Sequence, residues 1–455
     1  MHQGLALPQR LFAIFSVSAG TVLLTMDASI ATVALPTIAR DLHVESSASV
    51  LVVIVYNLVL AMTLLPFAGM GERAGLRKLF CSGLIVYTLA AALCYVANSL
   101  AFLIVLRAVQ ALGAAGALSV SIALVRSIYP AAQLGRGLGL NTVAGVTGAA
   151  MAPALGGLIL SVTSWHWVFA AGVPLAILSL ASSRALPASQ LKEHPLDVLG
   201  TALCAATFGL VICGLESVTR GYLLVSTAFL LTGALAGFIF IRHELNVRHP
   251  VLPVDLLARP DIALSVVAAF SAVLGSTILI LSMPFRLHEY GFGSAEIGAV
   301  FVPFAVTSGL FSPVSGMLSD RVAPALLGTI GLAAAMLGVL FLSFLPIHPN
   351  HFDLAWRMGL CGLGFGLFFS PNARLIVGSA PPDRAAPASS LIATTRMFGQ
   401  ALGSTLLGGL LAIGVGASSV SALIAAGLVL VAGLCSAARL RLVPQSSTVP
   451  PPTTD

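Results

Sequence analysis

The chain has 455 residues, of which 58% are hydrophobic and only 8% are charged, and its formal net charge is +6 at pH 7. Soluble domains carry about 25% charged residues, so this composition excludes an ordinary soluble protein. The positive charge therefore points to membrane topology rather than to a nucleic-acid partner. The six cysteines fall in apolar segments without CxxC or Cys/His spacing, so we interpret them as buried thiols, not as a metal site or disulfides.

Apolar segments long enough to cross a bilayer follow one another along the chain with short breaks. Each is a continuous apolar run rather than an alternating one, which favours helices over a β-barrel. We therefore predict an all-α polytopic membrane protein with about fourteen membrane-spanning helices. The predicted spans are residues 11–38, 48–70, 78–97, 100–125, 137–162, 165–186, 196–216, 222–242, 262–286, 295–318, 323–345, 353–375, 386–414 and 418–438.

Basic residues predict the orientation of these spans. If the N-terminus is cytoplasmic, most arginines and both lysines fall on the inner side, as the positive-inside rule requires. Both termini are then cytoplasmic. The Pro/Ser/Thr-rich tail, residues 444–455, is predicted to be disordered.

The first span contains a carboxylate, Asp27, in the stretch "LLTMDASIATVALP". It lies too deep to reach water, and inserting an aspartate there costs about 2.5–3.5 kcal/mol. Because burial disfavours the charged form, Asp27 can alternate between a protonated and an ionised state. We interpret it as the site of proton coupling and of attraction for a substrate cation. The alternative is an aspartate hydrogen-bonded permanently to neighbouring hydroxyls.

The loop after the second span reads "AGMGERAGLRKLF", and an equivalent "PVSGMLSDR" follows the tenth span. Gly75 permits a tight turn, and the charges can hold one conformation and release another. The alternative is a solvated basic turn that only obeys the positive-inside rule. The predicted cytoplasmic gating residues are Glu72, Arg73, Gly75, Arg77, Lys78, Asp320 and Arg321.

"PFAGMGER" and "PVSGMLSDR" occupy the same offset after a fresh start of the chain, which indicates an internal repeat. We predict a six-helix half at 1–187, an inserted helix pair at 188–250 and a second six-helix half at 251–443.

The fourth span contains Arg107 and Gln110 in "RAVQALGAAG". An arginine at that depth is costly unless it faces a polar cavity or a partner. The alternative is that the long side chain extends to the outer surface.

The fifth span reads "GVTGAAMAPALGG", with Gly148, Pro153, Gly156 and Gly157 at regular spacing. Small residues let helices approach closely, and the proline bends the span. Close packing without any role in transport is the alternative.

Together these motifs resemble known family signatures. The loop resembles the signature loop of the major facilitator superfamily, and the fourth-span stretch resembles its Arg-x-x-Gln-Gly motif. The fifth span resembles the antiporter motif of proton-driven exporters. "MDASIATVALPTI" resembles the first-span motif of the fourteen-helix drug:proton antiporters of the EmrB/QacA type. The resemblance implies two halves that rock about a central cavity, driven by a proton gradient without a cofactor or metal.

We therefore predict a proton-coupled exporter of lipophilic, cationic compounds in the bacterial cytoplasmic membrane, acting as a monomer on small molecules and protons. A metabolite or self-made antibiotic is the alternative substrate. An embedded enzyme or sensor is disfavoured, because the sequence shows no HExxH-type motif and no soluble domain. Arg396 in the thirteenth span is interpreted as a structural partner of a neighbouring helix end. The predicted cavity-lining residues are Asn57, Asn141, Phe368, Phe369 and Asn372.

Overall fold

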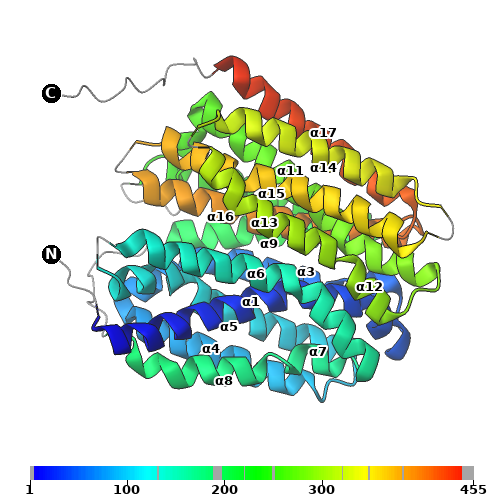
Figure 1. The fold of residues 1–455 in the computed structure, drawn as a ribbon, viewed down its shortest axis with the longest axis horizontal. Helices are drawn as coiled ribbons and strands as arrows, with labels where there is room; N and C mark the ends of the chain where they lie inside the picture. Colours follow the sequence, from blue (N-terminus) through cyan, green and yellow to red (C-terminus); the bar gives the residue numbers. More distant parts are fainter. Residues whose placement is uncertain are drawn as a thin grey trace.

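The computed structural model describes residues 5–130, 133–187, 197–219, 221–247, 252–319, 321–346, 349–381 and 384–442. These residues form a bundle of helices without any β-strand among them (Figure 1). Asp320 and the tail at 444–455 lie outside the described residues, and the side chain of Glu72 is not described either.

The helices follow the predicted spans in order. The first half contains α1 (Leu7–Asp41), α2 (Ser46–Ser49), α3 (Leu51–Ala74), α4 (Leu76–Cys94), α5 (Leu100–Ile128), α6 (Leu134–Val162), α7 (His166–Ala170), α8 (Val173–Ser182) and the 3-10 turn η2 (Ser183–Ala185). Then come α9 (Val198–Thr219) and α10 (Leu223–Glu244). The second half contains η3 (Val254–Ala258), α11 (Pro260–Glu289), α12 (Ser294–Val300), α13 (Val302–Leu318), α14 (Pro324–Ser343), α15 (His351–Ser379), α16 (Ala385–Ala412) and α17 (Ser419–Leu442).

Thirteen helical stretches in the described part of the chain are long and apolar enough to cross a membrane. The fourteenth predicted span is α16, which has 28 residues. It is less apolar than the others because it carries Arg396, Gln400 and several Ser, Thr and Gly residues. The predicted all-α membrane architecture is confirmed. The six cysteines are free, but Cys213 is exposed on α9 and not buried as expected.

Helix contacts recur in two parallel series. In the first half α1 packs against α6 and α8, and α5 packs against α3 and α4. In the second half α11 packs against α16 and α17, and α15 packs against α13 and α14 in the same way. Figure 1 shows these as two layers of helices. The series support the repeat, and the boundaries at 187, 250 and 443 remain our proposal.

The pair α9 and α10 packs closely on itself, and α9 also contacts α3 and α16. Ser226 Oγ on α10 donates a hydrogen bond of 2.8 Å to the Gly214 carbonyl on α9. The pair therefore lies beside the junction of the two halves.

The two halves meet most closely at the end of the bundle far from the termini (Figure 1). There Gly157 on α6 lies against Gly298 on α12, and a Cβ on Gly157 would lie 2.6 Å from Gly298 Cα. Gly148 and Gly156 allow α6 to approach α1, because a Cβ on either would contact the Val22 or Ile30 carbonyl. The fifth-span glycines thus serve two different contacts.

Buried side chains from both halves close this end. Leu281, Phe285, Ala401 and Leu407 of the second half join a cluster built mainly from the first half. At the end that holds the termini, the buried cluster around Leu256 and Ile376 contains second-half residues only. The halves are thus closed together at one end and are separately packed at the other. With the predicted topology, the separately packed end faces the cytoplasm.

The predicted topology is tested by reporter fusions after residues 192, 248 and 46. We expect the first two to report the cytoplasmic side and the third to report the opposite side, because the positive-inside rule orients the spans in that way. Reporters at 192 and 248 on opposite sides would contradict the count of spans.

The glycine contact between the halves is tested by Gly157→Leu. We expect normal insertion and loss of transport, because the larger side chain holds the closed end apart. Maleimide labelling of a cysteine placed at Leu281, in a cysteine-free background, should rise. Gly427→Leu is the matched control, since its Cβ would meet nothing within 4 Å. Unchanged labelling and wild-type transport in Gly157→Leu would show that the contact is ordinary packing.

Candidate functional site

Asp27 and Arg107 form an ion pair inside the first half. Arg107 Nη1 on α5 donates to Asp27 Oδ2 on α1 at 2.7 Å, and Nη2 donates to the Asp27 carbonyl at 3.4 Å. The Asp27 side chain is 3% exposed and that of Arg107 is 0% exposed. Arg107 therefore does not extend to the outer surface, and the partner of Asp27 is a guanidinium rather than a set of hydroxyls.

Other groups hold the Arg107 guanidinium in place. Its Nε donates to the Val52 carbonyl on α3 at 3.3 Å, and Nη1 also donates to Gln110 Oε1 at 3.1 Å. The Tyr56 ring lies 4.1 Å from the guanidinium carbon and the Phe169 ring lies 5.2 Å away. Aromatic faces attract cations through their quadrupole. The pair thus ties α1, α3 and α5 together.

Removing only one partner of this ion pair is costly. Removing one partner of a buried ion pair leaves an uncompensated charge and typically destabilises a protein by about 3–5 kcal/mol. A proton on Asp27 removes one charge without removing an atom. The carboxylate of Asp27 thus contacts a guanidinium that is shared among three helices.

Gln110 adds an unused donor beside the ion pair. Its Oε1 accepts from Arg107, and the Cys94 thiol lies 3.6 Å from the same oxygen. Within the described part of the chain, its buried Nε2 has no hydrogen-bond partner. The amide can therefore bind a further acceptor if the pair rearranges.

The predicted cavity-lining asparagines have protein partners. Asn141 on α6 accepts from Thr21 on α1 at 2.9 Å. Asn57 on α3 donates to Ser404 on α16 at 3.4 Å, which links the two halves.

Asn372 belongs to a second polar cluster, in the second half. Its Oδ1 accepts from Arg439 Nη1, and Arg439 also donates to Ser265 at 2.8 Å. Arg439 is 0% exposed. Arg439 had no predicted role beyond its basic charge. Nothing in the local sequence pattern shows that α17 directs this side chain toward the protein interior.

The two predicted phenylalanines differ in their surroundings. Phe368 is fully buried in a cluster with Ala268, Leu332 and Val429, so the structure places it in the core and not on a cavity. Phe369 is half-buried and stacks on Phe365 at a centroid distance of 5.8 Å.

The predicted gating residues lie at the end that holds the termini. Gly75 has φ 101° between α3 and α4, a backbone conformation that favours glycine. Arg77 Nη1 donates to the Leu186 carbonyl at 3.4 Å. Arg73, Lys78 and Arg321 are exposed at the protein surface. The predicted gating acids Glu72 and Asp320 lie outside the described side chains.

Arg396 differs from its sequence interpretation as a structural partner. It makes no hydrogen bond or ion pair within the described part of the chain. It lies in the interior of α16, and it is an exposed residue.

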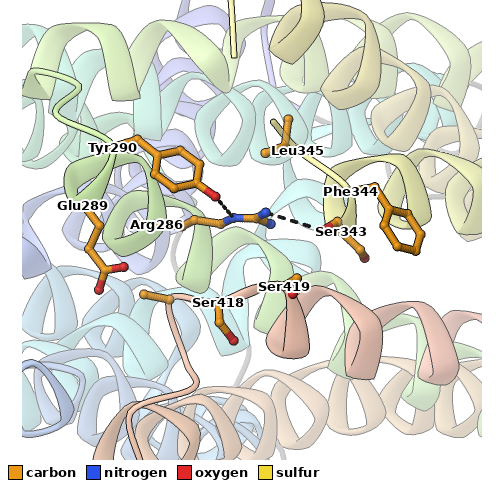
Figure 2. A pocket seen from close by; sticks show the side chains of 9 residues that line it. Arg286, Glu289, Tyr290, Ser343, Phe344, Leu345, Ser418 and Ser419 are labelled. Atoms are coloured by element: carbon orange, nitrogen blue, oxygen red, sulfur yellow. Dashed lines mark hydrogen bonds between the residues drawn. The ribbon is translucent and has the colours of Figure 1, made fainter. Parts of the chain in front are cut away.

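A depression of about 600 Å³ lies at the far end of the second half (Figure 2). Figure 2 shows Arg286 at its centre, with the Tyr290 hydroxyl accepting from Nε at 3.2 Å. Arg286 also donates to the carbonyls of Leu342 and Ser343, where α14 ends. A cation at a helix C-terminus stabilises the unsatisfied carbonyls. The depression contains none of the predicted site residues.

Comparisons with known proteins agree with this architecture. The chain is 37% identical over 443 residues to the "Uncharacterized transporter YebQ" of Escherichia coli K12, covering 96% of this chain and 97% of the relative. It is 29% identical to the "Multidrug resistance protein Stp" of Mycobacterium tuberculosis, covering 89% and 76%.

The fold is similar to solved transporter structures. A bacterial homologue of the human lysosomal transporter Spinster, solved in an inward-facing and unoccupied conformation, matches with a TM-score of 0.68 at 17% identity. The match covers 97% of this chain and 100% of the other. The model of the Major Facilitator Superfamily matches residues 17–242 and 265–455. The chain is therefore a membrane transporter of the Major Facilitator Superfamily, and not an enzyme.

Proposed function

We propose that this transporter exports lipophilic small molecules from the bacterial cytoplasm in exchange for protons. The observation that carries the proposal is the buried Asp27–Arg107 pair, an ionisable carboxylate placed where its charge state decides how three helices are held. The multidrug resistance protein Stp supports export as the direction of transport.

The proposed cycle begins from the ionised pair. A proton that binds Asp27 Oδ2 neutralises the carboxylate and removes the charge that holds Arg107. Arg107 then keeps its contacts to Val52 and Gln110, while α1 is no longer held to α5 by an ion pair. Loss of the proton to the other side restores the pair. Each protonation state thus favours one arrangement of the helices.

The closed end gives this change a path to the second half. Ile30 and Val33, about one and two turns after Asp27 on α1, belong to the buried clusters that close the two halves together. A shift of α1 against α5 therefore changes the packing of that end. The charged loops around Arg73 and Arg321 at the other end are our proposed latch for the opposite conformation.

The structure gives less support than the sequence to a cationic substrate. The sequence favoured cationic substrates because Asp27 was the carboxylate at mid-depth. In the structure Arg107 already neutralises this carboxylate. A cation would have to compete with Arg107 for Asp27, so the ion pair lends cationic substrates little support.

The proton-coupling role is tested by Asp27→Asn and by the double variant Asp27→Asn/Arg107→Gln. We expect both to lose proton-driven dye efflux from cells. The single variant should also lower the thermal stability of the purified protein, because Arg107 is left buried and unpaired, by about 3–5 kcal/mol. The double variant removes both charges and should recover much of this loss.

Glu289→Gln serves as the control, since Glu289 is an exposed acid near the far end of α11. Asp27→Glu should keep part of the efflux. If either asparagine variant pumps at the wild-type rate and abundance, proton coupling depends on another group.

A further inference from the structure

Helix α16 uses three of its faces for packing. Ser404 contacts Asn57 of α3, Gly403 lies against Thr277 of α11, and Phe398 stacks on Phe208 of α9 at 4.6 Å. At 100° per residue, Arg396 lies opposite the face that contacts α9 and between the faces that contact α3 and α11. From this spacing we infer that its side chain is directed between α3 of the first half and α11 of the second half.

Exposure along this central face of α16 changes at one level. Ser389 and Arg396 are exposed, and Ile392, Ala393 and Gln400 are partly exposed. One turn further, Gly403 is buried, and Leu407 is 0% exposed in the cluster that closes the halves. The accessible face therefore runs from the end that holds the termini up to Gln400. Arg396 lies about one turn before the end of this accessible face.

Among the described residues, no acid or hydrogen-bond acceptor is paired with Arg396. It lies about 17 Å along the axis from the start of α16, at the depth of the membrane interior. Asp27, the buried acid at a comparable depth in the other half, is already bound to Arg107. A guanidinium at such a depth is tolerated where it faces a polar, water-filled space or a partner.

We propose that Arg396 binds an anionic group of the transported molecule, so that the substrates are lipophilic compounds with a carboxylate, sulfonate or phosphate. This assignment rests on the proposed export function and names its substrate class. The guanidinium fork matches a carboxylate with two parallel hydrogen bonds. The Gln400 amide, one turn away on the same face, supplies a further donor. Ile392 and Ala393 give the apolar body of the molecule a surface beside the charge.

The same geometry disfavours a monovalent cation. A fixed positive charge with no acid paired to it among the described residues repels a cation in a medium of low dielectric constant. Arg107 and Arg396 then have different tasks. Arg107 is held by Asp27 and responds to the proton, whereas Arg396 is free to bind the transported group.

The test uses two probes with the same pyrene body and opposite charges, 1-pyrenebutyrate and 1-pyrenebutyl-trimethylammonium. Binding is measured by fluorescence anisotropy with the full chain in phosphatidylcholine nanodiscs, and empty nanodiscs are subtracted. We expect wild type to bind the carboxylate probe more tightly than the ammonium probe. Arg396→Gln should weaken carboxylate binding roughly ten- to hundredfold, as expected for loss of a charge-assisted contact. Arg396→Lys should restore part of it.

Arg242→Gln is the matched control, because Arg242 lies exposed on α10 and its loss removes the same charge. Equal carboxylate binding by wild type and Arg396→Gln would overturn the proposal, as would tighter binding of the ammonium probe by wild type. A second set of nanodiscs contains phosphatidylglycerol. If this lipid displaces the carboxylate probe, the site binds an anionic headgroup and the substrate assignment is wrong.

Uptake of both probes into everted vesicles separates this inference from the proposed function. Proton-driven uptake of the ammonium probe alone would leave export in place and contradict the role of Arg396. Arg396-dependent carboxylate binding without any proton-driven uptake would support the site and contradict proton coupling.

Discussion

The burial of a carboxylate together with a guanidinium is the constraint on which the rest of this structure depends. Neither Asp27 nor Arg107 is tolerable alone at that depth, and together they connect α1, α3 and α5. Because the pair is held by charge, a single proton can change it, whereas an apolar contact of the same size would not respond to pH. The contact among these three helices is therefore sensitive to the loss of a single charge.

For this local change to drive transport, each half must move as a rigid body. The closed end is built from backbone-to-backbone packing at Gly157 and Gly298 and from small side chains such as Ala401. Interfaces of this kind have two packed states rather than a continuum, because each extra methyl group would clash. Arg396 lies directly below this end, where a bound molecule would be enclosed when the other end closes. Proton and substrate would then bind in different halves and act on the same interface.

Much of the fold was predictable from the sequence because bilayer spans are long, continuous and apolar, and because the repeat near Pro66 and Pro313 is local. Asp27 and Arg107 stood out as charges in apolar runs. The features that the sequence did not predict depend on the rotation of each helix about its axis. Phe368 lies in the core, Arg439 is directed inward, and Arg396 is exposed without a partner among the described residues. Hydropathy does not report rotation in a span that is apolar on every face.

The central claim is that Asp27 changes protonation state as the halves alternate. Infrared difference spectroscopy of the full chain in lipid, recorded between acidic and neutral pH, measures this directly through the carboxylic C=O band. We expect a band that grows on acidification and is absent from Asp27→Asn. The band should be weaker in protein that is cross-linked at the far end between residues 157 and 298, because this conformation keeps the Asp27–Arg107 pair intact. A spectrum without any band that depends on Asp27 over the pH range in which the wild type transports would contradict the account.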